Sequence, residues 1–543
     1  MGPVPGLPNT FMIANRKQIV ILGGGFGGVY TARCLERILR PDEADICLIN
    51  RENYWVYQPM LPEVISGSIG LTDVVSPIRR LCPRTNLVMR EVEDVDLKNK
   101  VVTVSPGFRP RQKKIPFDYL VIALGEVTNF YGMPGMLENV MPFRTLADAM
   151  ALRNHVIHVL EEADVEEDSD LRRKLLTFVV GGGGFSGVEV IAELNNFVRS
   201  VKKNYLRLRK EEVRAVLVHS RGRILPEMAD PLALFAQKIL TKRGVEIILN
   251  DRLVAATSEK AILKSGLDIP CKTIISTVPS AGPPVLAKLD CPRDKGKLLV
   301  NSSLELQSFE GQAWALGDCA AIKTASGKAV PPTAQHATRE ATTCAINIAA
   351  AIRGGTPSLF AFEGLGTLGS LGHGSAVAQI LGVKISGWLA WFLWRCIYLA
   401  KIPGIKPKVR ISMDWFVHLL FPPDLAQTRI DQESGIKNQH FEPGDIIFHQ
   451  GDLGDSVYVI QQGECDVIKE ENGAAGTVAT LRAGDYFGEM ALLSDKTRNA
   501  TIQARTAMEV LLIPKGDFDT LRKSVPAFSE VFHELARKRN SGC

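Results

Sequence analysis

Two copies of one sequence pattern predict an α/β protein with two Rossmann-like dinucleotide-binding domains. Each copy has an apolar strand, a glycine-rich turn with G-x-G-x-x-G spacing and an amphipathic helical run. The first glycine of such a turn allows a tight bend, the second lets the backbone approach a pyrophosphate, and the third lets the helix pack on the strand. The phosphates then face the free N–H groups of the helix N-terminus. The glycines are Gly23, Gly25 and Gly28 in the first copy and Gly182, Gly184 and Gly187 in the second.

The first copy continues as a dinucleotide-binding unit. Ile19–Leu22 is its apolar strand, and Ile46–Ile49 is its second strand. An acid usually ends that second strand, where it bonds the ribose hydroxyls. This chain has Asn50 there, and an amide can still hydrogen-bond a hydroxyl. The run 117–125 predicts a strand that returns to a glycine turn at Gly125, beside the first nucleotide.

A third motif indicates what the two units hold. The segment 314–318 is an apolar strand that ends in Gly317 and Asp318. One dinucleotide site is typical of a dehydrogenase, whereas two in series indicate a flavin and a nicotinamide held face to face.

The second unit departs from the usual pattern at the end of its second strand. Ala215–Val218 is the strand, and His219, Ser220 and Arg221 follow it. Without an acid there is no repulsion against a 2′-phosphate, and Arg221 can pair with one. We therefore expect NADPH to be used at least as readily as an acid-bearing relative would use it. The alternative is that Arg221 is solvated and His219 only packs.

Composition places the chain among ordinary globular proteins. Its 543 residues are 45% hydrophobic and 23% charged, and the net charge of +5 is small for this length. We therefore expect no nucleic acid partner. The ten cysteines include no C-x-x-C pair and no even spacing, which fits reduced thiols in a cytosolic compartment. No metal site is predicted, and the first 17 residues do not resemble a signal peptide.

An apolar, aromatic segment predicts attachment to a membrane surface. Three of the six tryptophans fall within 388–394, Arg395 interrupts that run, and a second aromatic run covers 415–421. Neither run reaches the roughly twenty apolar residues that a spanning helix needs. Basic residues between the runs can meet anionic lipid while the rings lie at the headgroup level. The alternatives are a buried helical hairpin and the interface of a homodimer.

The composition changes after residue 421. A double proline and a polar linker precede β-rich runs at 445–449, 456–461 and 465–469, which predict a separate β-domain. The tail 518–539 has helical periodicity. The predicted divisions are 16–150 and 291–370 for the first unit, 151–290 for the second, 371–421 for the amphipathic anchor, 422–440 for the linker and 441–540 for the β-domain.

Most of residues 18–421 resemble the type II NADH:quinone oxidoreductases. The likeness rests on the two glycine turns, Phe185–Glu189, Arg223–Pro226, the Leu-Gly-Asp string and Pro331–Ala337. The aromatic-basic segment also resembles that family's membrane anchor. The resemblance implies hydride transfer from a nicotinamide to FAD and then reduction of a membrane quinone, without proton pumping. It also implies a peripheral protein at the cytoplasmic face of a bacterial inner membrane.

The resemblance assigns roles to individual residues. Glu189 matches the family's glutamate near the nicotinamide, and Gln335 lies in its quinone-side motif. Alternatively, Glu189 is an ordinary acid in the first turn of a helix, and Gln335 simply begins a helix. Arg339 and Glu340 stand where the family's glutamine-rich motif continues, which leaves the details of the quinone site open. The implied FAD-binding residues are Gly23, Gly25, Gly28, Asn50, Gly125, Gly317 and Asp318, and the implied nicotinamide-binding residues are Gly182, Gly184, Gly187, His219 and Arg221.

The C-terminal β-domain resembles the cyclic-nucleotide-binding domains, which fold as a β-roll (jelly roll). Phe487–Leu493 and Arg498–Thr501 look like that family's phosphate-binding cassette. Arg498 would pair with the cyclic phosphate, and Glu489 would accept from the ribose 2′-hydroxyl. We expect cAMP or cGMP as effector and favour cAMP; the alternative is a β-roll kept as a structural or dimerising module. The implied contact residues are Gly488, Glu489, Ala491, Arg498, Asn499, Ala500 and Thr501.

Other classes of protein fit the sequence less well. A disulfide reductase needs paired cysteines beside its flavin, but Cys34 and Cys47 are wrongly spaced. A sulfide:quinone oxidoreductase needs redox cysteines that face the flavin, and we interpret the lone candidate, Cys319, as a small buried residue. No helix-turn-helix follows the β-roll, so a transcription factor is not expected. The rival hypothesis is a cyclic-nucleotide-binding membrane scaffold whose flavin acts as a redox sensor and does not turn over.

Overall fold

The computed structural model describes residues 16–107, 111–278, 280–324, 327–427, 437–441, 443–454, 456–471, 474–490 and 497–518. The chain divides into two compact units, residues 1–102 with 116–428 and residues 103–115 with 429–543. Every helix in the described ranges falls short of the length and hydropathy that crossing a bilayer requires.

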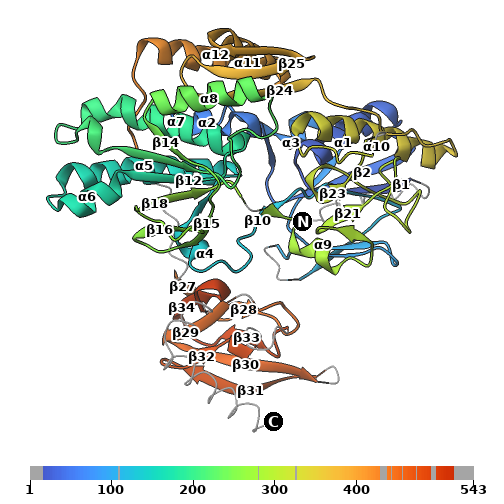
Figure 1. The fold of residues 1–543 in the computed structure, drawn as a ribbon. Helices are drawn as coiled ribbons and strands as arrows, with labels where there is room; N and C mark the ends of the chain where they lie inside the picture. Colours follow the sequence, from blue (N-terminus) through green and yellow to red (C-terminus); the bar gives the residue numbers. More distant parts are fainter. Residues whose placement is uncertain are drawn as a thin grey trace. The chain divides into compact units, whose positions relative to one another are not determined.

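The first parallel sheet carries the first glycine turn (Figure 1). Its strands lie in the order β22 (Ala313–Ala315), β9 (Tyr119–Ile122), β1 (Lys17–Leu22), β2 (Ala44–Asn50) and β5 (Asn86–Met89), with all neighbours parallel. Helix α1 (Phe26–Ile38) follows the turn and packs against α10 (Ala334–Arg353). Ile19 to Leu22 are fully buried, as expected of a parallel strand whose two faces are both covered.

The second parallel sheet repeats this arrangement around the second glycine turn. Its strands lie in the order β11 (Met141–Pro142), β18 (Thr273–Ser276), β12 (Thr177–Gly181), β13 (Arg214–Val218) and β14 (Val245–Ile248). The associated helices are α5 (Leu146–Val165), α7 (Phe185–Val201) and α8 (Asp230–Lys242). The two sheets confirm the predicted α/β class with Rossmann-like parallel sheets.

A small antiparallel sheet and two helices cover one side of the second domain (Figure 1). The sheet comprises β24 (Gly366–Ser370), β25 (Ala376–Ile380) and β26 (Val383–Gly387), and it contacts both α7 and α8. Helix α11 (Trp388–Lys401) continues directly from β26, and α12 (Ile405–Leu420) follows after a short turn. These elements contain the predicted aromatic segment.

The remaining short strands and helices all precede the C-terminal β-domain in the chain. They are β3 (Tyr54–Val56), α2 (Leu61–Ile65), β4 (Val75–Pro77), α3 (Ile78–Leu81), β6 (Val92–Asp96), β7 (Val101–Val104), β8 (Lys113–Pro116), β10 (Val127–Thr128), α4 (Met136–Asn139), α6 (Ser169–Leu175), β15 (Leu253–Ala256), β16 (Lys260–Leu263), β17 (Asp268–Pro270), β19 (Ser280–Ala281), α9 (Pro284–Lys288), β20 (Arg293–Asp294), β21 (Lys297–Leu299) and β23 (Ala320–Ala321). Single 3₁₀ turns lie at η1 (Gln58–Met60), η2 (Lys202–Asn204), η3 (Lys210–Glu212) and η4 (Gly317–Cys319).

The C-terminal unit is an antiparallel β-domain. One sheet has the order β27 (Lys437–Phe441), β34 (Met508–Pro514), β29 (Ser456–Gln462) and β32 (Tyr486–Phe487), and the other has the order β28 (Ile446–Phe448), β33 (Thr501–Ala504), β30 (Glu464–Glu471) and β31 (Ala474–Arg482). Buried Phe448, Tyr458 and Phe487 pack in its core, with the last two rings stacked at 5.0 Å. This confirms the predicted β-domain. The predicted helical tail, from residue 519 onward, lies outside the described residues.

Candidate functional site

Of the three motif glycines in the first turn, Gly23 and Gly28 leave no room for a side chain, and Gly25 faces open space. Gly23 has a φ of +100°, and a Cβ there would lie 2.3 Å from the carbonyl oxygen of Ala123. A Cβ on Gly28 would lie 1.8 Å from the carbonyl oxygen of Gly23, so helix and turn meet only because this residue is glycine. A Cβ on Gly25 would meet nothing within 4 Å. The turn therefore has an open face at the N-terminus of α1, where an anionic group can approach the backbone.

Asn50 supports this turn from the end of β2. Its Oδ1 accepts a hydrogen bond from the backbone N–H of Gly24 at 2.8 Å, and its Nδ2 donates to the carbonyl of Glu52 at 2.8 Å. The structure therefore gives Asn50 a role in shaping the turn. Its predicted bond to a ribose stays a prediction.

The Gly-Asp motif lies at the end of β22, in the same sheet. Gly125 and Gly317 have φ values of +64° and +71°, and a Cβ on either would meet nothing within 4 Å. Asp318 and Lys297 line a small cavity beside Gly317. Burial raises the pKa of Asp318, and the Arg144 guanidinium lies 3.9 Å from its carboxylate.

Glu340 holds the Gly-Asp motif in place. Its buried Oε2 accepts from the backbone N–H of Gly317 at 2.7 Å, and burial raises the pKa of Glu340 to about 7. In the sequence this residue marked only a departure from a glutamine-rich motif.

The second glycine turn has the same construction as the first. Gly182 has a φ of +114°, and a Cβ on Gly187 would lie 1.7 Å from the carbonyl oxygen of Gly182. At Gly184 the nearest atom to a Cβ would be Glu227 Oε1 at 4.0 Å, so this position is open. The turn is therefore a second backbone surface for an anion.

His219 lies behind the second turn, at the end of β13. Its Nδ1 accepts from the backbone N–H of Gly183 at 3.1 Å, which requires a neutral ring with the proton on Nε2. Burial and the nearby Arg221 guanidinium lower the pKa of His219, which favours that neutral form. Its buried Nε2 has no hydrogen-bond partner among the described residues, whereas Arg221 is exposed.

Glu189 is buried one turn into α7. Its Oε1 accepts from the backbone N–H of Ser370 at 2.9 Å, which ties α7 to the end of β24. Burial, together with the carboxylates of Glu193 and Glu63, raises the pKa of Glu189 to about 8. Sequence reasoning selected Glu189 but missed Glu193 and Glu63. A second acid four residues along an apolar helix was the available signal for Glu193.

Gln335, at the start of α10, bonds the loop that leads into β24. Gln335 Nε2 donates to the carbonyl of Gly366 at 3.0 Å, and its Oε1 accepts from the N–H of Leu365 at 3.2 Å. The Gln335 amide therefore binds the backbone at the start of β24. The Arg339 guanidinium lies 4.2 Å from the ring centroid of Phe362.

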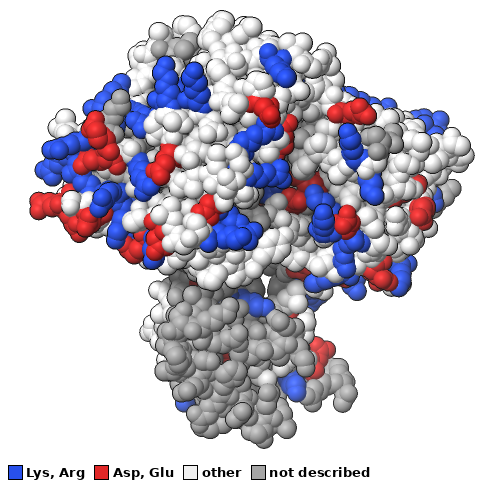
Figure 2. All heavy atoms as spheres, in the orientation of Figure 1, with Lys and Arg blue, Asp and Glu red and all other residues white. Residues whose placement is uncertain are grey.

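Helices α11 and α12 combine a buried polar contact with an exposed apolar face. Arg395 lies 4.0 Å from the Trp391 ring, 4.4 Å from the Trp415 ring and 3.9 Å from the Glu63 carboxylate. The outer surface of the two helices is mostly free of charge in Figure 2. Large side chains that stay at least half exposed there are Trp388, Leu389, Ile405, Val409, Met413, Phe416, Leu420 and Phe421.

In the C-terminal unit, buried Arg498 is turned toward the backbone. It donates to the carbonyls of Gly488 at 2.6 Å and Ser456 at 2.9 Å, and it lies 4.2 Å from the Phe448 ring. Glu489 is also buried. Of the other predicted contact residues, Asn499 is exposed, Ala500 is half-buried, the Thr501 hydroxyl accepts from Gln450, and Ala491 lies outside the described residues.

Three family models match successive parts of the chain. Residues 17–341, more than half of the chain, match the pyridine nucleotide-disulphide oxidoreductase model. Residues 365–424 match the NDH2 C-terminal domain, and residues 438–524 match the cyclic nucleotide-binding domain.

Similar proteins cover about three quarters of this chain. The type II NADH:quinone oxidoreductase Ndh of Mycobacterium tuberculosis is 27% identical over 435 residues, which cover 77% of this chain and 91% of that protein. Demethylphylloquinone reductase NdbB of Synechocystis is 29% identical and covers 75% of this chain and 97% of that protein. The solved structure of NDH2 from Plasmodium falciparum in complex with NADH has a TM-score of 0.69 at 20% identity and covers 76% of this chain and 99% of that chain.

Proposed function

The chain belongs to the pyridine nucleotide-disulphide oxidoreductase family, and from this membership we propose that it passes electrons from a nicotinamide nucleotide through FAD to a membrane quinone. It has the domain set of a type II NADH:quinone oxidoreductase, with a cyclic-nucleotide-binding domain in addition. The relatives named above are an NADH:quinone oxidoreductase and a reductase of a quinone, and the structural neighbour holds NADH. Regulation, membrane attachment and the roles of single residues are the finer parts of the proposal.

The groups around the first glycine turn and the Gly-Asp motif suit FAD. Open space at Gly25, Gly125 and Gly317 allows the close backbone approach that a pyrophosphate and its neighbouring chain require. Asp318 and Lys297 lie beside Gly317 with a carboxylate and an ammonium for hydroxyl and phosphate groups. FAD, when bound, supplies two-electron chemistry that no side chain supplies.

The second parallel sheet and its glycine turn would bind the nicotinamide nucleotide in the same way. The open backbone at Gly184 would hold its pyrophosphate, and His219 and Arg221 would lie beside its adenosine ribose. Glu189, fixed by Ser370, lies one helical turn further on, toward the nicotinamide side. Gln335 positions the start of β24 on the quinone side.

One observation carries the proposal: two glycine turns of the same construction occur in one compact unit, each with space for an anion at a helix N-terminus. The test is the absorbance spectrum of the purified protein, followed by steady-state oxidation of NADH with a soluble quinone analogue. We expect a yellow protein whose flavin turns over. A protein that stays colourless after reconstitution with FAD would overturn the proposal. A flavin that is reduced slowly and is not reoxidised by the quinone would favour the membrane scaffold instead.

Membrane attachment follows from the face of α11 and α12. Trp388 is 64% exposed and Phe416 is 58% exposed, which water alone disfavours. Such a face fits the headgroup boundary of a bilayer, with Lys406 and Lys408 near anionic lipid. The protein would then be peripheral, on the cytoplasmic side of a bacterial inner membrane. Replacing Trp388 and Phe416 by serine should move it from vesicles into the supernatant in a sedimentation assay.

Regulation by cAMP or cGMP rests on the β-domain. A cyclic phosphate would compete with the carbonyls of Gly488 and Ser456 for the Arg498 guanidinium. The experiment adds saturating cAMP or cGMP to the holoenzyme and follows NADH oxidation and membrane binding. Arg498→Ala is the matched control. No change in rate, KM or membrane partition would leave the β-domain as a structural module.

A further inference from the structure

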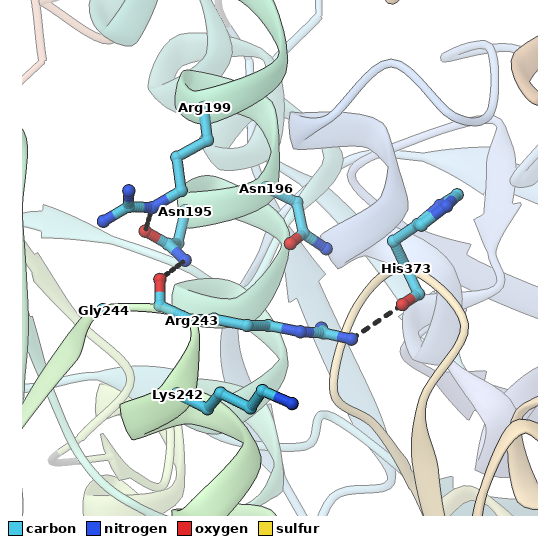
Figure 3. Close-up of a pocket in the computed structure, with 7 residues that line it drawn as sticks. All are labelled: Asn195, Asn196, Arg199, Lys242, Arg243, Gly244 and His373. Carbon is cyan, nitrogen blue, oxygen red and sulfur yellow. Dashed lines mark hydrogen bonds between the residues drawn. The ribbon is translucent and has the colours of Figure 1, made fainter. Parts of the chain in front are cut away.

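A basic cavity lies at the carboxyl ends of α7 and α8, beside the turn between β24 and β25 (Figure 3). Its volume is about 440 Å³. Three of its lining side chains carry a guanidinium or ammonium group, and none of the lining residues in the described ranges is acidic. The proposed function gives this cavity no role. The side chains that line it are those of Asn195, Asn196, Arg199, Lys242, Arg243 and His373.

Three backbone carbonyls that would repel an anion here are already bound by lining side chains. Asn195 Nδ2 donates to the carbonyl of Arg243 at 3.1 Å. The Arg243 guanidinium reaches across to the turn, where it donates to the carbonyl of Leu371 and, at 2.7 Å, to that of His373 (Figure 3). The acceptors of the cavity are therefore largely used, and the groups that stay free are mainly donors.

Three donor groups of the cavity lack a partner in the part of the chain that the structure describes. The Lys242 ammonium makes no hydrogen bond or ion pair there. Arg199 donates from Nε to Asn195 Oδ1 at 2.8 Å, which leaves its two terminal amino groups free. The Nδ2 of Asn196 is buried and has no hydrogen-bond partner. Because an unpartnered buried donor is costly, a ligand that accepts from it gains binding free energy.

Two glycines let these donors lie close to the backbone. Gly372 has a φ of +82°, and a Cβ there would lie 2.0 Å from Asn196 Nδ2 and 3.2 Å from Arg243 Nη1. Gly244 has a φ of +81°, and a Cβ there would lie 2.6 Å from Arg199 Nη2. A side chain at either position would displace a donor. The donors are thus positioned by the fold before any ligand binds, which lowers the cost of binding.

The charge of the cavity matches that of a phosphate monoester. Burial lowers the pKa of Arg243, and the charge of Glu193 opposes this shift, so Glu193 neutralises at most one of the three cations. Arg199 and Lys242 form no ion pair with a described residue, and they leave two positive charges at the cavity. A phosphate monoester carries about −1.5 to −2 at pH 7 and offers three strong acceptor oxygens.

The size and place of the cavity indicate an organic group on the phosphate. Ligand cavities typically measure about 300 to 1,000 Å³, and this cavity falls within that range. Strand β25, which follows the turn that carries His373, packs against both α8 and α11. Because α11 carries exposed aromatic side chains, the phosphate can belong to a lipid headgroup as well as to a soluble ester.

We propose that the basic cavity binds a phosphate monoester group. Lys242 and Arg199 oppose its charge, and Asn196 donates to one of its oxygens. The bound group adds a link between α7 and α8, which Asn195 and Arg243 already join. The two sources of the group are a lipid, phosphatidic acid, and a soluble ester such as glycerol 3-phosphate. The site does not depend on electron transfer, so its test is independent of the proposed function.

Calorimetric titration of the flavin-loaded protein with glycerol 3-phosphate tests the site. Saturating NAD⁺ and cAMP are present, so that the other proposed phosphate sites are occupied. In Lys242→Glu the Kd should rise by about 10-fold or more, because a carboxylate replaces the ammonium beside the phosphate. Lys238→Glu is the matched control, because Lys238 is an exposed lysine one turn earlier on α8 and does not line the cavity. Its Kd should stay within about 2-fold of wild type.

Sedimentation with phosphatidylcholine vesicles distinguishes the two sources. One set of vesicles contains phosphatidic acid, and the other contains phosphatidylglycerol, whose phosphate is a diester. A preference for phosphatidic acid that Lys242→Glu abolishes and Lys238→Glu keeps assigns the site to a lipid. Binding of glycerol 3-phosphate that depends on Lys242, without this preference, assigns the site to a soluble ester.

A second variant tests the cavity from α7. Asn196→Asp places a carboxylate at the unpartnered donor with almost no change in volume, and it should weaken phosphate binding as Lys242→Glu does. The proposal is overturned if neither glycerol 3-phosphate nor phosphatidic acid binds the wild type. It is also overturned if the wild type, Lys242→Glu and Asn196→Asp bind them equally. Arg199 and Lys242 would then serve only to stabilise the carboxyl ends of their helices.

Discussion

The two glycine turns of this protein have the same construction, yet the helices that follow them bury different kinds of side chain. In both, a Cβ on the last glycine would collide with the carbonyl oxygen of the first. The distance would be 1.8 Å from Gly28 to Gly23 and 1.7 Å from Gly187 to Gly182. In both, a polar side chain from the neighbouring strand accepts from the turn: Asn50 from Gly24 and His219 from Gly183. The same backbone geometry, with an open position for an anion, thus occurs twice.

The difference begins one helical turn later. Helix α1, which packs against α10, buries Val29, Thr31, Ala32 and Leu35, and the Thr31 hydroxyl donates to the carbonyl of Gly27 in the same helix. Helix α7 instead buries the carboxyl groups of Glu189 and Glu193, and Glu189 accepts from the backbone N–H of Ser370 in β24. The two turns therefore share their backbone geometry, while the helices that follow them differ in whether they bury acids.

The largest expected effect separates the two turns. Gly28→Ala should remove FAD, and Gly187→Ala should leave the protein yellow but raise the Kd for NADH by about 100-fold or more, because each methyl group collides with a carbonyl of its own turn. Flavin content and NADH titration measure the two effects. Gly25→Ala is the control, because its methyl group meets no protein atom: the fold should stay intact while FAD binding weakens. Equal loss of both cofactors in Gly28→Ala and Gly187→Ala would contradict independent turns.

The next effect concerns His219 and Arg221, which follow β13 beside the second turn. Arg221→Ala should lower kcat/KM for NADPH about 10-fold and change that for NADH little, because a 2′-phosphate loses a charge-assisted bond. His219→Glu should move the preference further toward NADH, because a carboxylate repels the phosphate and accepts from ribose hydroxyls. Specificity constants for both nucleotides measure this. A large NADH preference of the wild type would show that Arg221 is only solvated.

The local features of both turns could be predicted from the sequence. Spacing of glycines after an apolar strand predicted both turns, both helices and the parallel sheets, because these depend on neighbours within about 30 residues. It could not reveal that Glu63 faces Glu193, 130 positions away, or that Glu340 binds Gly317. Nor could it show Gln335 fixed to the backbone of Gly366. Such pairs form only when distant elements pack. The sequence around a single acid therefore does not predict which residue it will contact.

A smaller effect is expected at Asn50, whose side-chain amide hydrogen-bonds the backbone of both Gly24 and Glu52. Asn50→Ala removes the acceptor for the Gly24 N–H and should raise the Kd for FAD about 5-fold, the effect of one hydrogen bond of about 1 kcal/mol. Asn50→Asp keeps the acceptor and should bind FAD as tightly as wild type. Fluorescence titration of the apoprotein with FAD measures both. If Asn50→Asp loses as much affinity as Asn50→Ala, the Nδ2 bond to Glu52 matters more than the turn.

The smallest expected effect concerns the two buried carboxyl groups of α7, whereas the one acid of α1, Glu36, is only half-buried. The pKa of Glu193 is raised from 4.5 to about 8 on folding, so the folded protein binds the proton more tightly than the unfolded chain. The contribution of this group to stability is therefore fully present below about pH 4.5, falls as the pH rises toward 8, and is lost above it. Glu193→Gln removes the cost of a buried carboxylate and should raise the Tm by about 2 °C or more near pH 8, and less near pH 5.

Thermal unfolding followed by flavin fluorescence across this pH range measures the effect, with Glu305→Gln as the control for loss of a buried glutamate. A variant that is less stable than wild type at pH 8 would mean that the Glu193 carboxylate is held by Arg243 and Arg395 as an ion pair, because removing one partner leaves the buried guanidinium groups uncompensated. A more stable variant with slower quinone reduction would mean instead that α7 carries its buried acids for turnover at the expense of stability. The sign of the Tm shift, taken together with the rate of quinone reduction, thus decides whether the second helix differs from the first in structure alone or also in function.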